Sequence, residues 1–290
     1  METSELLKRV RKVELKAKGS SQNLFSGEYH SAFKGRGMSF SEVRDYRYGD
    51  DVRNIDWNVT ARTGDTHIKI FEEERELTVM LLVDVSGSAY FGTASQTKRY
   101  LMTELGAVLA FSAIQNNDKV GLLLFAHEVE LYIPPKKGRK HILRIIRELI
   151  NHEPQSVGTD VGAAMRYLNN VVKKRCITFV LSDFMSPDYS APLKVTARRH
   201  DLVGMRITDP REAELPNVGL LHAIDAESGE RQWVDTGSKR VREAYKLSYE
   251  NYEATFREQF LKSGADAVTL STGTPYRKPL LQFFERRKGV

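Results

Sequence analysis

Three oxygen-bearing side chains, Asp84, Ser86 and Ser88, occupy alternate positions of one short segment. Alternate residues of an extended loop point the same way, so one carboxylate and two hydroxyls face a common point. Such hard oxygen ligands suit a magnesium-type cation, and Gly87 allows the backbone to turn close to the ion. Because magnesium retains several waters, this set leaves a coordination place for a carboxylate from outside. The segment therefore predicts a site for one Mg2+ or Mn2+ ion.

Two further loops offer oxygen ligands to the same site. Thr159 lies in Gly-Thr-Asp-Val-Gly before an expected helix, and Asp183 follows an apolar run in Leu-Ser-Asp-Phe. We expect Thr159 to bind the ion through its hydroxyl and Asp183 to bind it directly or through water. Taken singly, each residue has an ordinary structural explanation, since Thr159 or Asp160 is a suitable helix cap and Asp is common at strand ends. The prediction depends on the three segments acting together.

The apolar pattern predicts elements that bring these loops to one edge of a sheet. Continuous apolar runs are typical of strands buried on both faces, whereas apolar residues three and four positions apart predict helices. Strands that alternate with helices imply a mostly parallel sheet with helices on both faces, whose ligands lie at the carboxyl ends of the strands. The expected strands are 78–84, 120–125, 128–133, 176–181, 202–207, 220–223, 232–235 and 267–270, and the expected helices are 98–116, 139–151, 161–170, 191–198, 239–261 and 275–287.

The order Asp-x-Ser-x-Ser, then Thr, then Asp resembles the metal-ion-dependent adhesion site of von Willebrand factor A domains. The resemblance implies a Rossmann-like α/β fold with a mostly parallel central sheet. It also implies a cation held by Asp84, Ser86, Ser88, Thr159 and Asp183. In such a site the cation accepts a Glu or Asp side chain from a partner protein.

The segment before this domain is similar to the signature of the family called domain of unknown function fifty-eight. The resemblance is carried by Gly35–Phe40, Arg44–Trp57, Ala61–Arg62 and Phe71–Glu72, and it extends over nearly the whole chain. Members of this bacterial family are often encoded beside MoxR-type AAA+ ATPases and membrane-anchored von Willebrand factor A proteins. The resemblance therefore implies an interaction module that acts with a MoxR-type AAA+ ATPase, and with such membrane-anchored proteins, in assembly or stress tolerance.

The sequence divides into two regions with different residue patterns. Residues 1–76 form the family-signature extension, in which 4–18 have the pattern of an amphipathic helix and 19–65 that of turns and short strands. Residues 77–290 form the von Willebrand factor A-like domain, with a hairpin and a long helix inserted near 218–262. We expect the extension to pack on the main domain. The dense, mixed charges between Arg44 and Arg62 predict an ion-pair network that fixes it to the sheet, and partner docking is the alternative.

The main alternative function is that of an enzyme, a magnesium-dependent phosphohydrolase with Asp84 as its nucleophile. Related folds place such an aspartate after the first strand, but the chemistry usually requires a second acid nearby to protonate the leaving group. Ser86 takes that place, and a serine does not supply an acid near neutral pH. The sequence also lacks a Gly-x-Ser-x-Gly elbow and a phosphate-binding P-loop. We therefore expect no enzymatic activity.

The composition is that of an ordinary globular protein. The 44 Lys and Arg residues against 38 Asp and Glu give a net charge of +6, an excess too small to indicate a nucleic-acid partner. Cys176, the single cysteine, cannot form an intrachain disulfide. No apolar run approaches the roughly 18 residues that span a bilayer, and the N-terminus lacks the apolar centre of a signal peptide. We therefore expect a cytoplasmic protein.

Overall fold

The computed structural model describes residues 39–72, 77–93, 96–225 and 229–288. The chain divides into a small unit, Lys34–Glu76, and a main unit that comprises Met1–Phe33 and Leu77–Val290. The amphipathic helix expected over 4–18 lies outside the described residues. The expected packing of the extension on the main domain stays a prediction.

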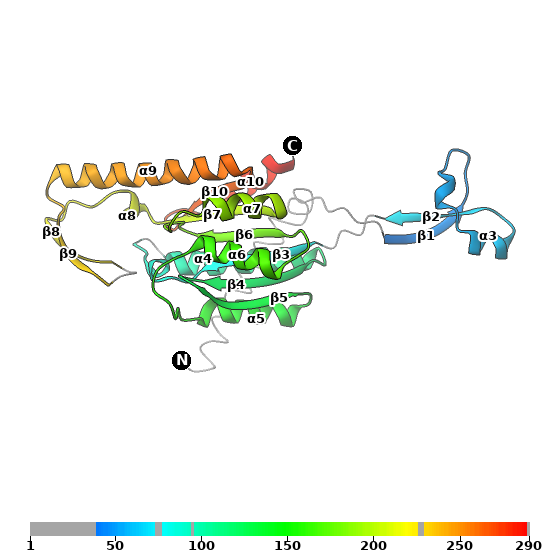
Figure 1. Cartoon of the computed structure of the whole chain (residues 1–290), viewed down its shortest axis with the longest axis horizontal. Coiled ribbons are helices and arrows are strands. Elements are labelled where there is room, and N and C mark those ends of the chain that lie inside the picture. Colours follow the sequence, from blue (N-terminus) through cyan, green and yellow to red (C-terminus); the bar gives the residue numbers. More distant parts are fainter. Residues whose placement is uncertain (1–38, 73–76, 94–95, 226–228, 289–290) are drawn as a thin grey trace. The chain divides into compact units, whose positions relative to one another are not determined.

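A six-stranded sheet forms the centre of the main unit (Figure 1). Its order is β10-β7-β6-β3-β4-β5, and only β5, at one edge, runs antiparallel to its neighbour. The order reverses between β3 and β6, which is the doubly wound arrangement predicted from the sequence. The strands are β3 (Thr78–Asp84), β4 (Lys119–Phe125), β5 (Val129–Lys136), β6 (Ile177–Ser182), β7 (Asp201–Thr208) and β10 (Asp266–Ser271).

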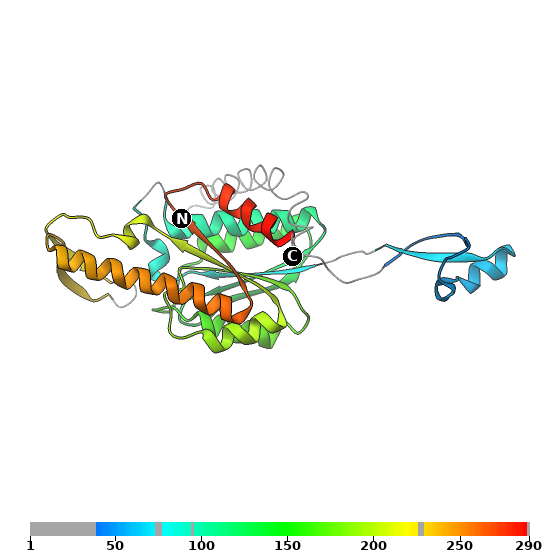
Figure 2. The same cartoon turned by 90° about the horizontal axis from the view of Figure 1, so that it is seen from above.

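Helices cover both faces of this sheet, as predicted (Figure 2). One face packs against α4 (Lys98–Gln115), α5 (Arg139–Asn151) and α10 (Arg277–Lys288). The other packs against α6 (Val161–Val171), α7 (Ser190–Arg199) and α9 (Lys239–Ser263). Among the described residues, no helix combines the length and the hydropathy that crossing a bilayer demands.

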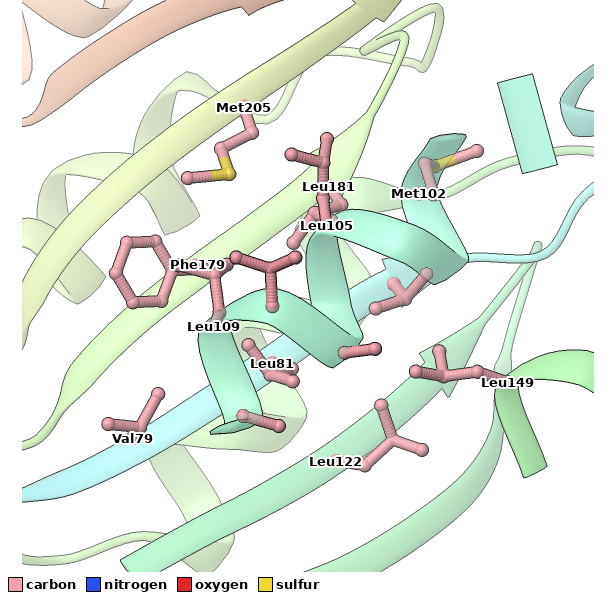
Figure 3. Packing of buried hydrophobic residues seen from close by; sticks show 14 of the residues in the cluster. Val79, Leu81, Met102, Leu105, Leu109, Leu122, Leu149, Phe179, Leu181 and Met205 are labelled. Carbon is pink, nitrogen blue, oxygen red and sulfur yellow. The ribbon is translucent and has the colours of Figure 1, made fainter. Parts of the chain in front are cut away.

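The core explains why the central strands read as continuous apolar runs. Alternate residues of β3 enter the two opposite clusters, Leu81 on the α4 side and Leu82 on the α6 side. In Figure 3 the side chains of Leu105 and Leu109 from α4 lie over the sheet beside Leu81. Because both faces of β3 are dry, Asp84 at its end projects from a rigid, apolar support.

The insertion after β7 contains the hairpin and the long helix expected near 218–262. It begins with a short helix, α8 (Pro210–Ala213), which the sequence analysis missed because four residues carry no periodicity. The antiparallel strands β8 (Leu220–Ile224) and β9 (Arg231–Asp235) follow, and α9 returns along the sheet (Figure 1).

The small unit is a two-stranded antiparallel sheet with a helical connection. Strands β1 (Ser39–Asp45) and β2 (His67–Glu72) flank a 3-10 turn, η1 (Val52–Asn54), and a helix, α3 (Trp57–Thr63). The prediction of turns and short strands missed α3. Its end signals are local: the Asp56 carboxylate caps its first turn, and Gly64, at φ 83°, ends it in the left-handed conformation.

The mixed charges of the small unit form local ion pairs. Arg44 donates two hydrogen bonds to the Asp50 carboxylate, at 2.9 and 2.8 Å, and Arg53 pairs with Asp51 at 2.8 Å. These pairs join residues six and two positions apart, so they shape the connection itself. The expected role of this network in fixing the extension to the sheet stays a prediction.

The close packing of α9 on β7 can be tested at Gly204. An added Cβ would lie 2.3 Å from Cζ of Phe260, closer than two carbon atoms can approach. We expect Gly204→Ala to lower the free energy of unfolding by about 2 kcal/mol through overpacking. Urea denaturation measures the loss, and the added cost of Gly204→Ala should shrink in a Phe260→Leu background. An equal cost in both backgrounds would contradict this contact.

Candidate metal centre

Asp84 ends β3 as a buried carboxylate, 2% exposed. Its Oδ1 accepts a hydrogen bond from the Ser86 amide at 2.9 Å, and its Oδ2 accepts one from the Ser182 hydroxyl at 2.6 Å. Ser182 ends the neighbouring strand β6, and its hydroxyl also accepts the Phe184 amide at 2.9 Å. The two strands on either side of the reversal in sheet order are therefore joined through Asp84.

The two predicted serine ligands lie together just beyond this carboxylate. Ser86 is fully buried, and its Oγ is 3.1 Å from Oγ of Ser88, which is partly exposed. Ser88 belongs to a 3-10 turn, η2 (Gly87–Tyr90), that folds the chain back immediately after Ser86. The structure therefore places the two hydroxyls side by side, directly after the Asp84 carboxylate in the chain.

Asp183 follows β6 and is 3% exposed. Its Oδ1 accepts the Met185 amide at 3.0 Å, which fixes the carboxylate at the end of the strand. It is close enough to Asp84 for the two negative charges to interact. The sheet therefore brings Asp84 and Asp183 together, as the parallel arrangement predicts.

Thr159 is buried in the loop before α6, 4% exposed. The amide of the following residue, Asp160, donates to the Ala126 carbonyl at 2.9 Å, and the Val161 amide donates to the Ser186 hydroxyl at 3.1 Å. These contacts hold the Thr159 loop between the segments that follow β4 and β6. Asp160 caps α6, accepting a backbone hydrogen bond at 2.8 Å. Of the two candidate caps, Asp160 takes the role.

The carboxylate pair is electrostatically unfavourable as it stands. Burial, together with the charge of Asp183, raises the pKa of Asp84 to about 7, although hydrogen bonds from Ser182 and Ser86 oppose the shift. A group whose charged form is disfavoured in this way is stabilised by any cation placed beside it.

Sequence analysis missed two charged residues at this site, Lys98 and Glu212. The ammonium of Lys98, the first residue of α4, lies 2.6 Å from Asp183 Oδ2 and 2.5 Å from Glu212 Oε1. Lys98 is 1% exposed. The sequence carries only a weak signal for them: a lysine in the first turn of a helix is slightly unfavourable to the helix dipole, which does not reveal its acidic partners.

The donors present fit a hard divalent cation. Two carboxylates and the hydroxyls of Ser86 and Ser88 provide oxygen ligands, with the Thr159 hydroxyl on an adjoining loop, and oxygen is what Mg2+ and Mn2+ prefer. Within the described ranges, no group of three or more His, Cys, Asp or Glu side chains is arranged to hold a metal. A cation here would therefore depend on hydroxyls as much as on carboxylates.

Solved structures share this architecture. One is an aerotolerance-related membrane protein from Bacteroides fragilis, with a TM-score of 0.50 and 17% identity over 72% of this chain and 99% of that one. Another is the SpRpn10 VWA domain, with a TM-score of 0.41 and 10% identity over 73% of this chain and 95% of that one. At such identities the similarity concerns the fold alone. With the doubly wound sheet, the predicted α/β fold, a mostly parallel central sheet with helices on both faces, is confirmed.

Within this class the chain belongs to a particular family. Residues 42–255 match the family described as "Protein of unknown function DUF58", and the chain is a member of it. A similar protein from Mycobacterium tuberculosis (strain H37Rv), described as uncharacterized, is 30% identical over 285 residues, which cover 97% of this chain and 90% of that protein. The family resemblance stated from the sequence is confirmed.

The hydrogen bond that joins β3 to β6 can be tested at Ser182. We expect Ser182→Ala to lower the free energy of unfolding by about 1–3 kcal/mol, because it removes a donor to Asp84 and the acceptor of a buried amide. Guanidinium denaturation measures the loss. Ser112→Ala is the matched control, because the buried Ser112 hydroxyl donates to the Val108 carbonyl of its own helix and alanine is favourable in a helix. Equal stabilities of the two variants would contradict the prediction.

Proposed function

We propose that this protein is a non-enzymatic protein-interaction module with a metal-dependent adhesion site. Asp84, Ser86, Ser88, Thr159 and Asp183 hold one Mg2+ or Mn2+ ion. The bound cation supplies a coordination place for a Glu or Asp carboxylate of a partner. The observation that carries the proposal is the buried pair of Asp84 and Asp183 beside clustered hydroxyls at the carboxyl edge of the sheet.

The chemistry of the ligands supports binding of an outside carboxylate. Because most of its ligands are neutral hydroxyls, the ligand set does not surround a divalent ion with excess negative charge. The ion therefore keeps its attraction for a further acidic group. A partner carboxylate at this position completes the oxygen environment, and removal of the ion removes the attraction.

The surroundings of Asp84 favour binding over phosphoryl transfer. Each of its oxygens already accepts a hydrogen bond, from the Ser86 amide and the Ser182 hydroxyl, and these bonds draw electron density away from a nucleophile. The position two residues on is Ser86, which supplies no acid for a leaving group. The arrangement around Asp84 therefore does not favour a magnesium-dependent phosphohydrolase.

The partner that we propose is a MoxR-type AAA+ ATPase, in assembly or stress tolerance. Support comes from membership of the DUF58 family, because the resemblance to that family implies genes that are often encoded beside such ATPases. Membrane-anchored von Willebrand factor A proteins are further proposed partners. The fold similarity to an aerotolerance-related membrane protein agrees with a shared setting. We place the protein in the cytoplasm, where such an ATPase acts.

The proposed site predicts two changes in stability of opposite sign, one in the presence of metal and one in its absence. Mg2+ or Mn2+ should raise the melting temperature of the wild type, with about 2.7 kcal/mol of stabilisation when free metal is about 100 times its Kd. Asp84→Asn should abolish this increase. Without metal, the same variant should be more stable than the wild type by about 1 kcal/mol, because one of two buried like charges is gone.

Thermal denaturation with and without EDTA measures both effects. Asp188→Asn is the matched control, since Asp188 is an exposed aspartate five residues beyond Asp183 and should leave both effects unchanged. A metal-dependent rise in melting temperature that persists in Asp84→Asn would refute the site.

Partner binding should follow metal occupancy. We expect the purified MoxR-type ATPase of the same organism to bind the wild type with Mg2+, and to bind at least about tenfold more weakly after EDTA treatment or in Asp84→Asn. Surface plasmon resonance measures the affinities, with Asp188→Asn as the control that binds normally. Equal affinity in every condition would contradict metal-dependent docking to this ATPase.

A further inference from the structure

Lys98 is a buried cation at the edge of the candidate metal centre. Its side chain is 1% exposed, and its ammonium bridges two carboxylates, Asp183 and Glu212. A lysine is rarely this buried unless acidic groups hold it, because desolvation of the ammonium is costly. Burial lowers the pKa of Lys98, but the charges and hydrogen bonds of Asp183 and Glu212 outweigh it and raise this pKa overall. Lys98 is therefore a fixed positive charge.

The cluster formed by Asp84, Asp183, Glu212 and Lys98 carries more negative than positive groups. Asp84, Asp183 and Glu212 supply three carboxylates, whereas Lys98 supplies one ammonium directly bonded to two of them. One oxygen of Asp183 accepts the Met185 amide, and the other is the one that bonds to Lys98. A divalent cation that used Asp183 would therefore meet an ammonium already bound to the same carboxylate.

Glu212 is held in place independently of Lys98. Its Oε2 accepts the Asp209 amide at 2.8 Å in the capping box of α8. Asp209 in turn accepts hydrogen bonds from the hydroxyls of Thr93 and Thr272. Since these contacts already attach the start of the insertion to the sheet, the bridge to Lys98 is not required for that purpose.

We propose that Lys98 sets the affinity of the adhesion-type site for its cation, by competing with the divalent ion for Asp183. The proposal rests on the proposed function in that it concerns the same site. The ammonium and the metal neutralise one carboxylate and repel each other, so each weakens the binding of the other. Glu212 weakens this competition, because its carboxylate also pairs with the Lys98 ammonium and so weakens the pairing of Lys98 with Asp183.

The proposal predicts opposite effects for the two partners of one ion pair. Lys98→Met should raise the association constant for Mn2+ or Mg2+ at least about tenfold, because Asp183 loses a competing cation. Glu212→Gln should lower it severalfold, because Lys98 then pairs with Asp183 alone. Isothermal titration calorimetry of the full chain with each metal measures these constants. If Lys98 only held α8 in place, the two variants would not move metal affinity in opposite directions.

The double variant Lys98→Met/Glu212→Gln guards against loss of folding. Lys98→Met alone leaves buried Asp183 and partly buried Glu212 without their counter-ion. The double variant removes one charge of each sign and keeps the net charge of the cluster. Its affinity for metal should exceed that of the wild type, and circular dichroism checks that it is folded. If Lys98→Met does not fold, the double variant decides the question alone.

The outcomes separate this inference from the proposed function. If the wild type binds metal and the folded Lys98 variants bind it no more tightly, the role of Lys98 is refuted and the metal site stands. If the wild type binds no metal but the double variant does, the competition is supported and the metal-dependent function of the wild type is refuted. Absence of binding in the wild type and in every variant overturns both.

Discussion

Burial of two like charges at the end of a dry sheet is the constraint around which the polar structure of this protein is arranged. Asp84 and Asp183 end up together because β3 and β6 are parallel neighbours, and both are nearly excluded from solvent. Carboxylates in such a setting require hydrogen bonds or cations. Asp84 receives hydrogen bonds from Ser182 and the Ser86 amide, and Asp183 receives them from the Met185 amide and Lys98. The loops at this edge thus owe much of their conformation to charge compensation.

That compensation explains which parts of the fold were predictable from the sequence. The central strands were, because a strand buried on both faces must be apolar along its length, as Thr78–Asp84 and Ile177–Ser182 are. The helices that cover the sheet were found within a few residues of their ends. The short helices Trp57–Thr63 and Pro210–Ala213 were not, since their stability comes from capping by Asp56 and Asp209 rather than from an apolar stripe.

The candidate site was predictable only in part, for a related reason. A motif names side chains close together in the sequence, so Asp84, Ser86 and Ser88 could be proposed as ligands from the sequence. Lys98 and Glu212 are 114 positions apart and meet only because the insertion after β7 returns to the start of α4. Periodicity describes which face of an element is buried, but it does not reveal which charge of one element meets which charge of another. Long-range ion pairs are therefore the part of the site that required the structure.

The charges of Asp84 and Asp183 are only partly compensated, and this affects how the site can function. Lys98 and the hydrogen bonds to Asp84 reduce the cost of the carboxylate pair without requiring a metal ion. They leave negative charge uncompensated, so an attraction for a cation remains. Under the proposed function, the site takes up and releases its ion without unfolding of the domain. Reversible docking of a partner requires that property, because a cation held as a permanent structural element could not act as a switch for association.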